Sequence, residues 1–195
     1  MRVIAGSAGG IQLEVPKHGV RPTMDRVKGA IFSSLGDQVI GARVLDLFAG
    51  AGGLGIEALS RGATSVLFID HERQAINAIE KNLKKARVDG KTRQQDVFDF
   101  LQRLPSLGKF DLIFADPPYE QMSSGEKFTD QLLANNSLPT LLDDGGIFVL
   151  EKKPEEALPE IPLWTLVRQK TYGATEVLFL ATDRRSEMPG AQSPP

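Results

Sequence analysis

The chain has 195 residues, 41% of them hydrophobic and 25% charged, with a formal net charge of -2 at pH 7. This composition excludes a disordered chain, and the length suits one α/β domain with a small extension. The sequence has no cysteine and two histidines, which excludes disulfides and thiolate zinc sites, and we expect no metal. Its apolar runs are too short for a membrane span or a signal peptide, so we expect a cytoplasmic protein that does not bind membranes.

The chain begins with an expected extension over residues 1–40. Residues 2–5 and 11–15 are separated by glycines, which predicts a small β-hairpin. A helix is expected over residues 23–35, directly after Pro22. A tail over residues 183–195 contains proline, serine and glycine, and we expect it to be disordered.

Between these ends, residues 41–182 alternate short β-rich runs with helical periods, which indicates a single α/β domain. The expected strands are residues 43–48, 65–70, 92–95, 110–115, 147–151, 163–170 and 175–181. Helices are expected after the first strand and over residues 72–86, 97–104 and 126–134. The last two strands, joined around Tyr172-Gly173, are predicted to form an antiparallel hairpin that closes the sheet.

A glycine-rich turn follows the first strand of this domain. Gly50-Ala51-Gly52-Gly53-Leu54-Gly55 matches the pattern GxGxxG, which serves both nicotinamide dinucleotides and S-adenosylmethionine. A tight turn without a ligand is the remaining alternative. Asp46 lies four positions before Gly50, where its carboxylate would repel a pyrophosphate and attract the cationic S-adenosylmethionine. We therefore predict S-adenosylmethionine as cofactor, with Asp46, Phe48, Gly50 and Gly52 among its contacts.

Two further carboxylates follow later strands. Asp70 ends the second strand, where a carboxylate can accept hydrogen bonds from both ribose hydroxyls, as it also does in dinucleotide sites. Asp96 precedes a helix and could accept from the adenine amine, with the Val97 N–H reaching the adenine ring. Asp96 is equally suited to cap that helix, and both roles can hold together because a cap uses one carboxylate oxygen.

Asp116-Pro117-Pro118-Tyr119 ends the fourth strand and is the most specific pattern in the chain. The prolines stiffen the turn and leave the Pro117 carbonyl and the Asp116 carboxylate as two fixed acceptors, which suits an exocyclic NH2 group. Tyr119 offers a face on which a base can stack. Without a cysteine the chain cannot form the covalent adduct used for methylation at pyrimidine C5, so the expected target is an amine nitrogen.

With these two motifs the chain resembles the class I methyltransferases that modify exocyclic amines, and within them the bacterial 16S rRNA guanine-N2 methyltransferase family. The resemblance extends to about residue 182 and includes Arg21-Pro22-Thr23 and Lys170-Thr171-Tyr172-Gly173. It implies a Rossmann-like, seven-stranded, mostly parallel sheet with an antiparallel last strand. It also implies S-adenosylmethionine as donor, S-adenosylhomocysteine as product, and an amine site at Asp116, Pro117 and Tyr119. Residues 7–12 depart from the family, because they lack its usual aromatic and basic side chains.

Basic residues that could hold RNA occur in two stretches. Residues 1–43 carry six basic and three acidic side chains, and the second stretch lies between residues 81 and 93. The cations of the second stretch have an alternative role, in which they favour the dipole at the C-terminus of a helix and simply face solvent. We expect RNA contacts from Arg21, Arg26, Lys28 and, just past a strand end, Lys152.

The function predicted from these residues is methylation of a guanine N2 amine in 16S rRNA, within a small-subunit ribonucleoprotein and without an obligate protein partner. One alternative is a DNA adenine-N6 methyltransferase, because the Asp116 motif occurs there too. It is disfavoured because the chain has no segment left for a DNA target-recognition domain. Another is an inactive methyltransferase-like RNA-binding protein, which would be expected to lose Asp46 or Asp116.

Overall fold

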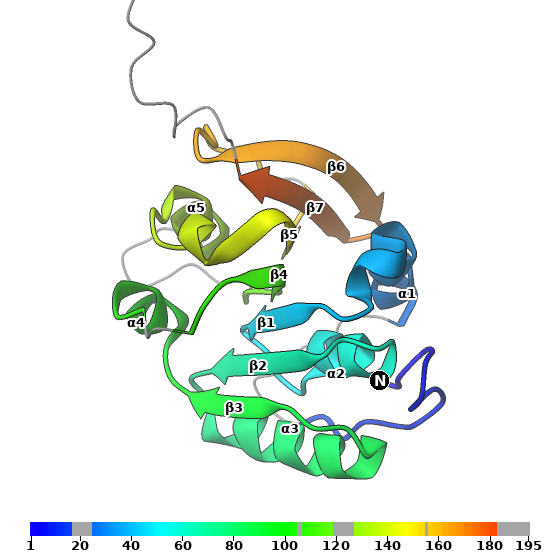
Figure 1. The fold of residues 1–195 in the computed structure, drawn as a ribbon. Helices are drawn as coiled ribbons and strands as arrows, with labels where there is room; N and C mark the ends of the chain where they lie inside the picture. Colours follow the sequence, from blue (N-terminus) through cyan, green and yellow to red (C-terminus); the bar gives the residue numbers. More distant parts are fainter. Residues whose placement is uncertain (17–24, 105–106, 119–126, 155, 183–195) are drawn as a thin grey trace, which may run out of the picture.

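A computed structural model describes residues 1–16, 25–104, 107–118, 127–154 and 156–182 (Figure 1). The predicted tail, Arg21 and Tyr119 lie outside these residues. Within the described part, one sheet runs through the centre and helices lie against both of its faces. The architecture is α/β, as the alternation of strand and helix patterns predicts.

The sheet has seven strands in the order β3-β2-β1-β4-β5-β7-β6. Strands β1 to β5 pair in parallel, whereas β7 runs antiparallel to both β5 and β6. This arrangement confirms the predicted mostly parallel sheet and its closing hairpin. The strands are β1 (Arg43–Leu47), β2 (Ser65–Asp70), β3 (Lys91–Gln94), β4 (Phe110–Ala115), β5 (Leu142–Lys152), β6 (Trp164–Tyr172) and β7 (Thr175–Thr182).

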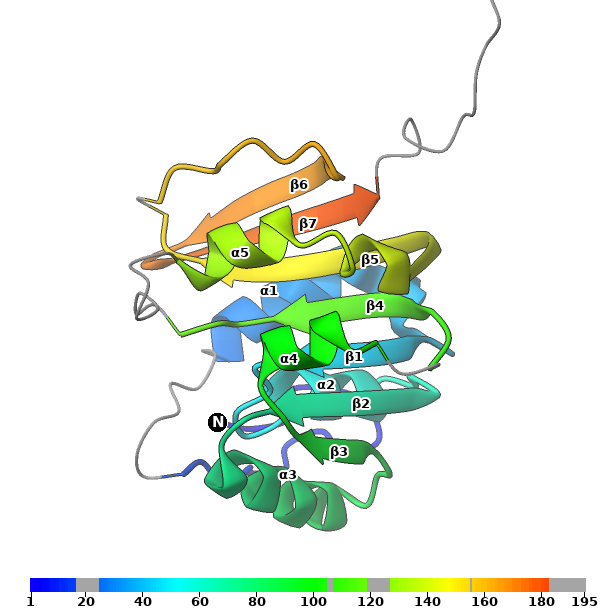
Figure 2. The same cartoon turned by 90° about the vertical axis from the view of Figure 1, so that its left-hand side faces the viewer.

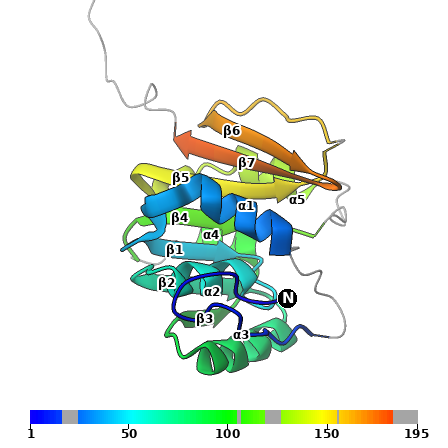
Figure 3. The same cartoon turned by 90° about the vertical axis from the view of Figure 1, so that its right-hand side faces the viewer.

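The helices divide between the two faces, as Figures 2 and 3 show from opposite sides. Helices α1 (Asp25–Leu35), α2 (Gly53–Ser60) and α3 (Arg73–Ala86) contribute to one apolar core. Helices α4 (Val97–Gln102) and α5 (Phe128–Ala134) contribute to the other. The central strands are buried on both faces, which explains their nearly continuous apolar sequence. Short 3-10 turns occupy Gly36–Val39 and Pro139–Leu141.

Strand β5 begins earlier than its sequence indicates. The polar and glycine residues 143–146 predict a turn before a strand at 147–151, yet the strand starts at Leu142. The pairing register between β4 and β5 shifts between Phe110 and Leu112, and Gly145 adopts a φ of 80°. A bulge therefore absorbs the turn-like residues without ending the strand.

The N-terminal segment, residues 1–16, crosses the outer side of α2 (Figure 3). The predicted hairpin is present in a short form. Arg2 and Gln12 form one antiparallel bridge, flanked by hydrogen bonds from the Val3 N–H to the Ile11 carbonyl and from the Leu13 N–H to the Met1 carbonyl. The ladder does not extend further because the backbone N–H groups of Ile4 and Ala5 donate to the Glu57 carboxylate of α2 instead. The segment is thus held by a helix more than by its own strand pairing.

Candidate active site

The carboxyl ends of β1, β2 and β4 bring the glycine turn, Asp70 and Asp116 to one edge of the sheet. Strand β1 lies between β2 and β4, and the chain order reverses between β1 and β4. In open α/β sheets, ligands bind outside the carboxyl ends of strands at this reversal. The glycine turn follows β1 and the Asp116 turn follows β4, so the two motifs predicted to hold cofactor and substrate are neighbours.

The glycines of the turn serve two physical needs. Gly50 and Gly52 have φ values of 55° and 79°, a left-handed conformation that favours glycine. Gly55 packs against β2, because a Cβ atom there would lie 2.2 Å from Cε1 of Phe68. The turn is therefore tight at its start and packed closely against the sheet at its end.

Asp46 supports the turn from within the protein. Its side chain is buried, and its Oδ2 accepts a hydrogen bond of 2.9 Å from the Gly55 N–H. Burial raises the pKa of Asp46 well above its usual range; the Gly55 hydrogen bond lowers it, and the charges of Asp116 and Asp70 raise it further. A cation bound nearby would stabilise the ionised form of this carboxyl.

Asp70 holds the other end of the same turn. Its Oδ2 accepts a hydrogen bond of 2.8 Å from the Gly50 N–H, and its Oδ1 accepts one of 2.9 Å from the Glu72 N–H. Both oxygens are thus engaged with the backbone, and the side chain is 9% exposed. The predicted contact with ribose hydroxyls stays a prediction, to be made with the remaining lone pairs of a carboxylate that already positions the turn.

Asp96 caps α4, one of the two roles its position predicts. Its Oδ1 accepts hydrogen bonds from the N–H groups of Phe98 at 2.8 Å and Asp99 at 3.1 Å. Because both bonds end on Oδ1, the cap leaves Oδ2 for the predicted contact with an adenine amine. Val97, the first residue of the helix, is buried.

Phe48 follows β1 with a φ of 55°, which is uncommon for a residue with a side chain. Its half-buried ring packs edge-on against Phe98, at 6.2 Å between centroids, and against Phe128, at 5.7 Å. Phe98 and Phe128 stack on each other at 6.1 Å. These three rings connect the turn after β1 with the first turns of α4 and α5, beside the carboxyl edge of the sheet.

Asp116 and Pro117 follow the last residue of β4 and are described, whereas Tyr119 is not. Asp116 lies close enough to Asp46 for its charge to raise the Asp46 pKa. The predicted amine acceptors thus lie beside the carboxylate that supports the cofactor turn. Their contact with a substrate amine stays a prediction.

Two of the cations predicted to contact RNA are buried, and this prediction is corrected. The Lys28 side chain is fully buried, where it pairs with Glu57 at 3.5 Å and donates to the Arg2 carbonyl at 2.5 Å. The Lys152 side chain is 2% exposed and pairs with Glu176 at 2.7 Å. An ammonium group inside the protein with its own carboxylate partner cannot reach an RNA phosphate.

Of the other predicted RNA contacts, Arg26 is exposed in the first turn of α1, and Arg21 lies outside the described residues. The alternative basic stretch is solvent-exposed at the end of α3 and along β3. It comprises Lys81, Lys84, Lys85, Arg87, Lys91 and Arg93.

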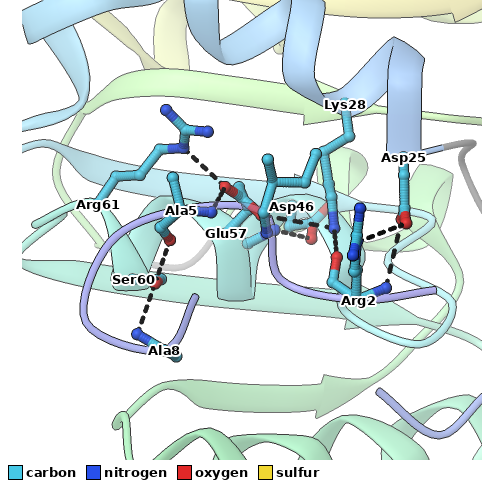
Figure 4. Close-up of polar contacts among 11 residues, drawn as sticks. Arg2, Ala5, Ala8, Asp25, Lys28, Asp46, Glu57, Ser60 and Arg61 are labelled. Carbon is cyan, nitrogen blue, oxygen red and sulfur yellow. Dashed lines mark hydrogen bonds and ion pairs between the residues drawn. The ribbon is translucent and has the colours of Figure 1, made fainter. Parts of the chain in front are cut away.

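Two buried polar residues that the sequence analysis did not single out hold backbone groups of the N-terminal segment, and one of them, Asn82, also binds the glycine turn. Glu57 in α2 and Asn82 in α3 are both fully buried. Figure 4 shows Lys28, Arg61 and the chain at Ala5 converging on Glu57. The sequence does carry a signal for Glu57. It is a single carboxylate in the apolar stretch 53–60, and a helix of this composition has no polar face, so its carboxylate must be buried with partners.

The strand order, the antiparallel β7 and the glycine turn after β1 together define the class I methyltransferase fold. The family model described as Conserved hypothetical protein 95 matches residues 1–181. The chain belongs to this family. Its relatives confirm the predicted resemblance to small-subunit rRNA methyltransferases.

Two relatives cover most of the chain. YlbH of Bacillus subtilis (strain 168), provisionally named an rRNA methyltransferase, is 40% identical over 185 residues, which are 91% of this chain and 96% of YlbH. Ribosomal RNA small subunit methyltransferase D of Haemophilus influenzae is 34% identical over 177 residues, 89% of each chain. The solved structure of yhhF from Escherichia coli, provisionally described as a methyltransferase, has a TM-score of 0.80 and 28% identity, covering 95% of this chain and 99% of yhhF.

The described residues contain no group of three or more histidine, aspartate or glutamate side chains arranged to hold a metal ion. No helix among them has the length and apolar character that crossing a membrane requires.

Proposed function

We propose that the chain transfers a methyl group from S-adenosylmethionine to the exocyclic N2 amine of a guanine in 16S rRNA. The observation that carries this proposal is the pairing of β1 with β4, which sets the glycine turn and Asp46 beside Asp116 and Pro117. The relative named for ribosomal small-subunit methylation supports rRNA as the substrate class. The guanine N2 position is the finer part of the proposal, and it follows from the resemblance.

The Asp116 turn fits the chemistry of an aromatic amine. The lone pair of such an amine is delocalised into its ring, so the nitrogen is a weak nucleophile. Hydrogen bonds from its two N–H groups to the Asp116 carboxylate and the Pro117 carbonyl favour a pyramidal nitrogen and stabilise the positive charge that grows on it. The nitrogen–carbon bond forms as the carbon–sulfur bond of the sulfonium breaks, and one amine proton then leaves to solvent. The product amine is neutral, and S-adenosylhomocysteine remains.

The residues around the turn fit this donor. Asp46 and Asp70 keep the Gly50–Gly55 backbone in place, and the buried Asp46 carboxyl favours a neighbouring cation. In the proposal, Asp70 also contacts the ribose, while Asp96 and the Val97 N–H contact the adenine. Phe48 contributes an apolar wall. These residues bind and orient the donor, while Asp116, Pro117 and Tyr119 orient the target base.

RNA contacts in the proposal come from Arg26 and Arg21, since Lys28 and Lys152 are buried. With Lys28 and Lys152 excluded, the proposed contacts neutralise few phosphates, so binding to bare RNA is expected to be weak and to weaken further as salt rises. A folded ribonucleoprotein can add contacts through its shape and bound proteins. The preferred substrate is therefore a small-subunit particle, and it is expected to outperform free rRNA as methyl acceptor.

The proposal is tested by methyl transfer from labelled S-adenosylmethionine to small ribosomal subunits from a strain lacking this enzyme, followed by nucleoside mass spectrometry. The expected product is N2-methylguanosine in 16S rRNA. Asp116→Ala and Asp116→Asn should abolish transfer while leaving S-adenosylmethionine affinity within a few-fold. Asp144→Asn, an exposed carboxylate at the start of β5, is the matched control and should retain full activity.

Three outcomes would contradict parts of the proposal. Transfer by Asp116→Ala at the wild-type rate would remove this carboxylate from the mechanism. N6-methyladenine formed in duplex DNA, with rRNA unmodified, would support the DNA adenine methyltransferase instead. Binding of RNA without methyl transfer to any nucleic acid would indicate an inactive RNA-binding protein.

A further inference from the structure

The carbonyl of Ala51, inside the glycine turn, is held by a side chain from α3. Ala51 is 2% exposed, and its carbonyl oxygen accepts a hydrogen bond of 2.9 Å from Nδ2 of Asn82. Asn82 is itself fully buried in the second half of α3. This contact joins the turn to a helix that lies well beyond it in the chain.

The same carboxamide holds the N-terminal segment. The Oδ1 of Asn82 accepts from the Glu14 N–H at 2.8 Å, and its Nδ2 donates to the Glu14 carbonyl at 2.9 Å. A side-chain amide carries the donor and acceptor of a peptide group, so Asn82 pairs with Glu14 as a neighbouring strand would. One side chain therefore fastens both the glycine turn and the segment that leads towards α1.

With this contact the turn is held at three points by three elements. Asp70 of β2 accepts from the Gly50 N–H, and Asp46 of β1 accepts from the Gly55 N–H. Asn82 of α3 instead donates to a carbonyl, which a carboxylate cannot do. The two carboxylates fix the ends of the turn, and the Asn82 amide fixes the peptide group that joins Ala51 to Gly52.

We propose that Asn82 is a positioning residue for S-adenosylmethionine, acting through the Ala51 carbonyl. Orientation of this peptide sets the direction of the turn's neighbouring N–H groups, including that of Gly52, which donates to the Ala49 carbonyl at 2.7 Å. A rotated peptide would break the Gly52 hydrogen bond and change the shape of the backbone that the cofactor is proposed to contact. Asn82 binds the Ala51 carbonyl and the Ala49 carbonyl binds the Gly52 N–H. Because both polar groups of this peptide have partners within the protein, the turn is set before the cofactor arrives.

The test compares three variants by calorimetric titration with S-adenosylmethionine, at a temperature where each is folded. Asn82→Asp keeps the size and the acceptor but loses both donors. Asn77→Asp makes the same change at an exposed position of the same helix and is the matched control. Glu14→Pro removes the N–H that donates to Asn82, together with an exposed side chain, and leaves the Ala51 contact in place.

The expected result is at least a tenfold rise in the dissociation constant for Asn82→Asp, with Asn77→Asp within twofold and Glu14→Pro within threefold of wild type. Hydrogen exchange at the amides of Gly52 and Gly53 should be faster in Asn82→Asp, while exchange in the distant β5–β7 pair stays unchanged. If Asn82→Asp does not fold, Asn82→Ser takes its place, because serine is too short to reach Ala51 and adds no charge.

Unchanged affinity in the folded Asn82 variant, despite a lower melting temperature, would overturn the proposal and leave Asn82 a purely structural role. An equal loss in Glu14→Pro would also overturn it, because the N-terminal contact and not the Ala51 contact would then carry the effect. Cofactor affinity and amide exchange are both measured without a methyl acceptor. Their outcome is therefore independent of whether that acceptor is guanine in rRNA.

Discussion

Replacing Glu57 by glutamine should strongly destabilise the fold, because Glu57 is the buried junction of three segments. Its carboxylate accepts from the N–H groups of Ile4 at 2.7 Å and Ala5 at 3.1 Å. It also pairs with Arg61 at 2.7 Å and with Lys28 at 3.5 Å. Glu57→Gln keeps the volume but removes the charge and turns one acceptor into a donor facing other donors.

The expected loss is about 3–5 kcal/mol of unfolding free energy, the usual cost of leaving one member of a buried ion pair without its partner. The Lys28 side chain is fully buried, so solvent screening does not reduce this figure. Arg61 is partly exposed, with 24% of its side chain accessible, and contributes less. In a chain of this size, the melting temperature should fall by about 6–20 °C.

The assay is urea unfolding of wild type, Glu57→Gln, Lys28→Met and the double variant, with Arg61→Gln as the partly exposed control. The double variant should lose less than the two single variants added together, because it leaves neither buried charge unpaired. Arg61→Gln should cost no more than about 1 kcal/mol. A loss below about 1 kcal/mol for Glu57→Gln, or strict additivity in the double variant, would refute the reasoning.

The pH dependence gives an independent check on the same pair. Burial lowers the pKa of Lys28 below its ordinary value of 10.5, and the Glu57 charge opposes that effect. Between the lowered pKa and 10.5, the unfolded chain binds more protons than the folded one, so stability rises with pH in this range. Glu57→Gln removes the opposing charge and should extend that rise to lower pH.

Three further predictions concern the N-terminal segment, the cofactor turn and a buried lysine. Gly6→Ala should lower the melting temperature more than Gly10→Ala. Both glycines have positive φ, but a Cβ at Gly6 would lie 1.8 Å from the last carbonyl oxygen of α2, whereas a Cβ at Gly10 would meet no atom within 4 Å. Equal losses would contradict the close packing of the N-terminal segment on α2. Burial raises the Asp46 pKa and a bound cation lowers it, so S-adenosylmethionine should bind with proton release and more tightly as pH rises towards that raised value. Calorimetry in buffers of different ionisation enthalpy should detect this release in wild type and not in Asp46→Asn. Lys152→Met should cost up to about 3–5 kcal/mol in urea unfolding, because the buried Glu176 keeps its hydrogen bonds from Gln169 and Thr171 but loses its cation. The salt dependence of RNA binding should stay unchanged, and a shallower one would restore Lys152 as an RNA contact.

Local sequence patterns predict the strand limits correctly where a turn signal is present, and they fail where a distant residue competes for the backbone. Strands β2 and β4 have the predicted limits, residues 65–70 and 110–115, because each apolar run ends at a clear turn signal. The predicted N-terminal hairpin has a single bridge, because Ile4 and Ala5 donate to a helix that local pattern could not place beside them. Local rules fail there since the competing partner comes from a distant part of the chain.

The sequence by itself determined the alternating fold, the glycine turn, the end of β4 before Asp116 and the cap at Asp96, because periodicity, turn residues and caps depend on neighbouring positions. Only the tertiary structure decided which polar side chains face solvent. Lys28 and Lys152 have the sequence character of surface cations, and Asn82 that of an ordinary helix residue, yet all three are buried against partners distant in sequence. The surroundings of a charge or an amide depend on which elements pack around it, and that packing is settled only when the whole sheet and its helices assemble.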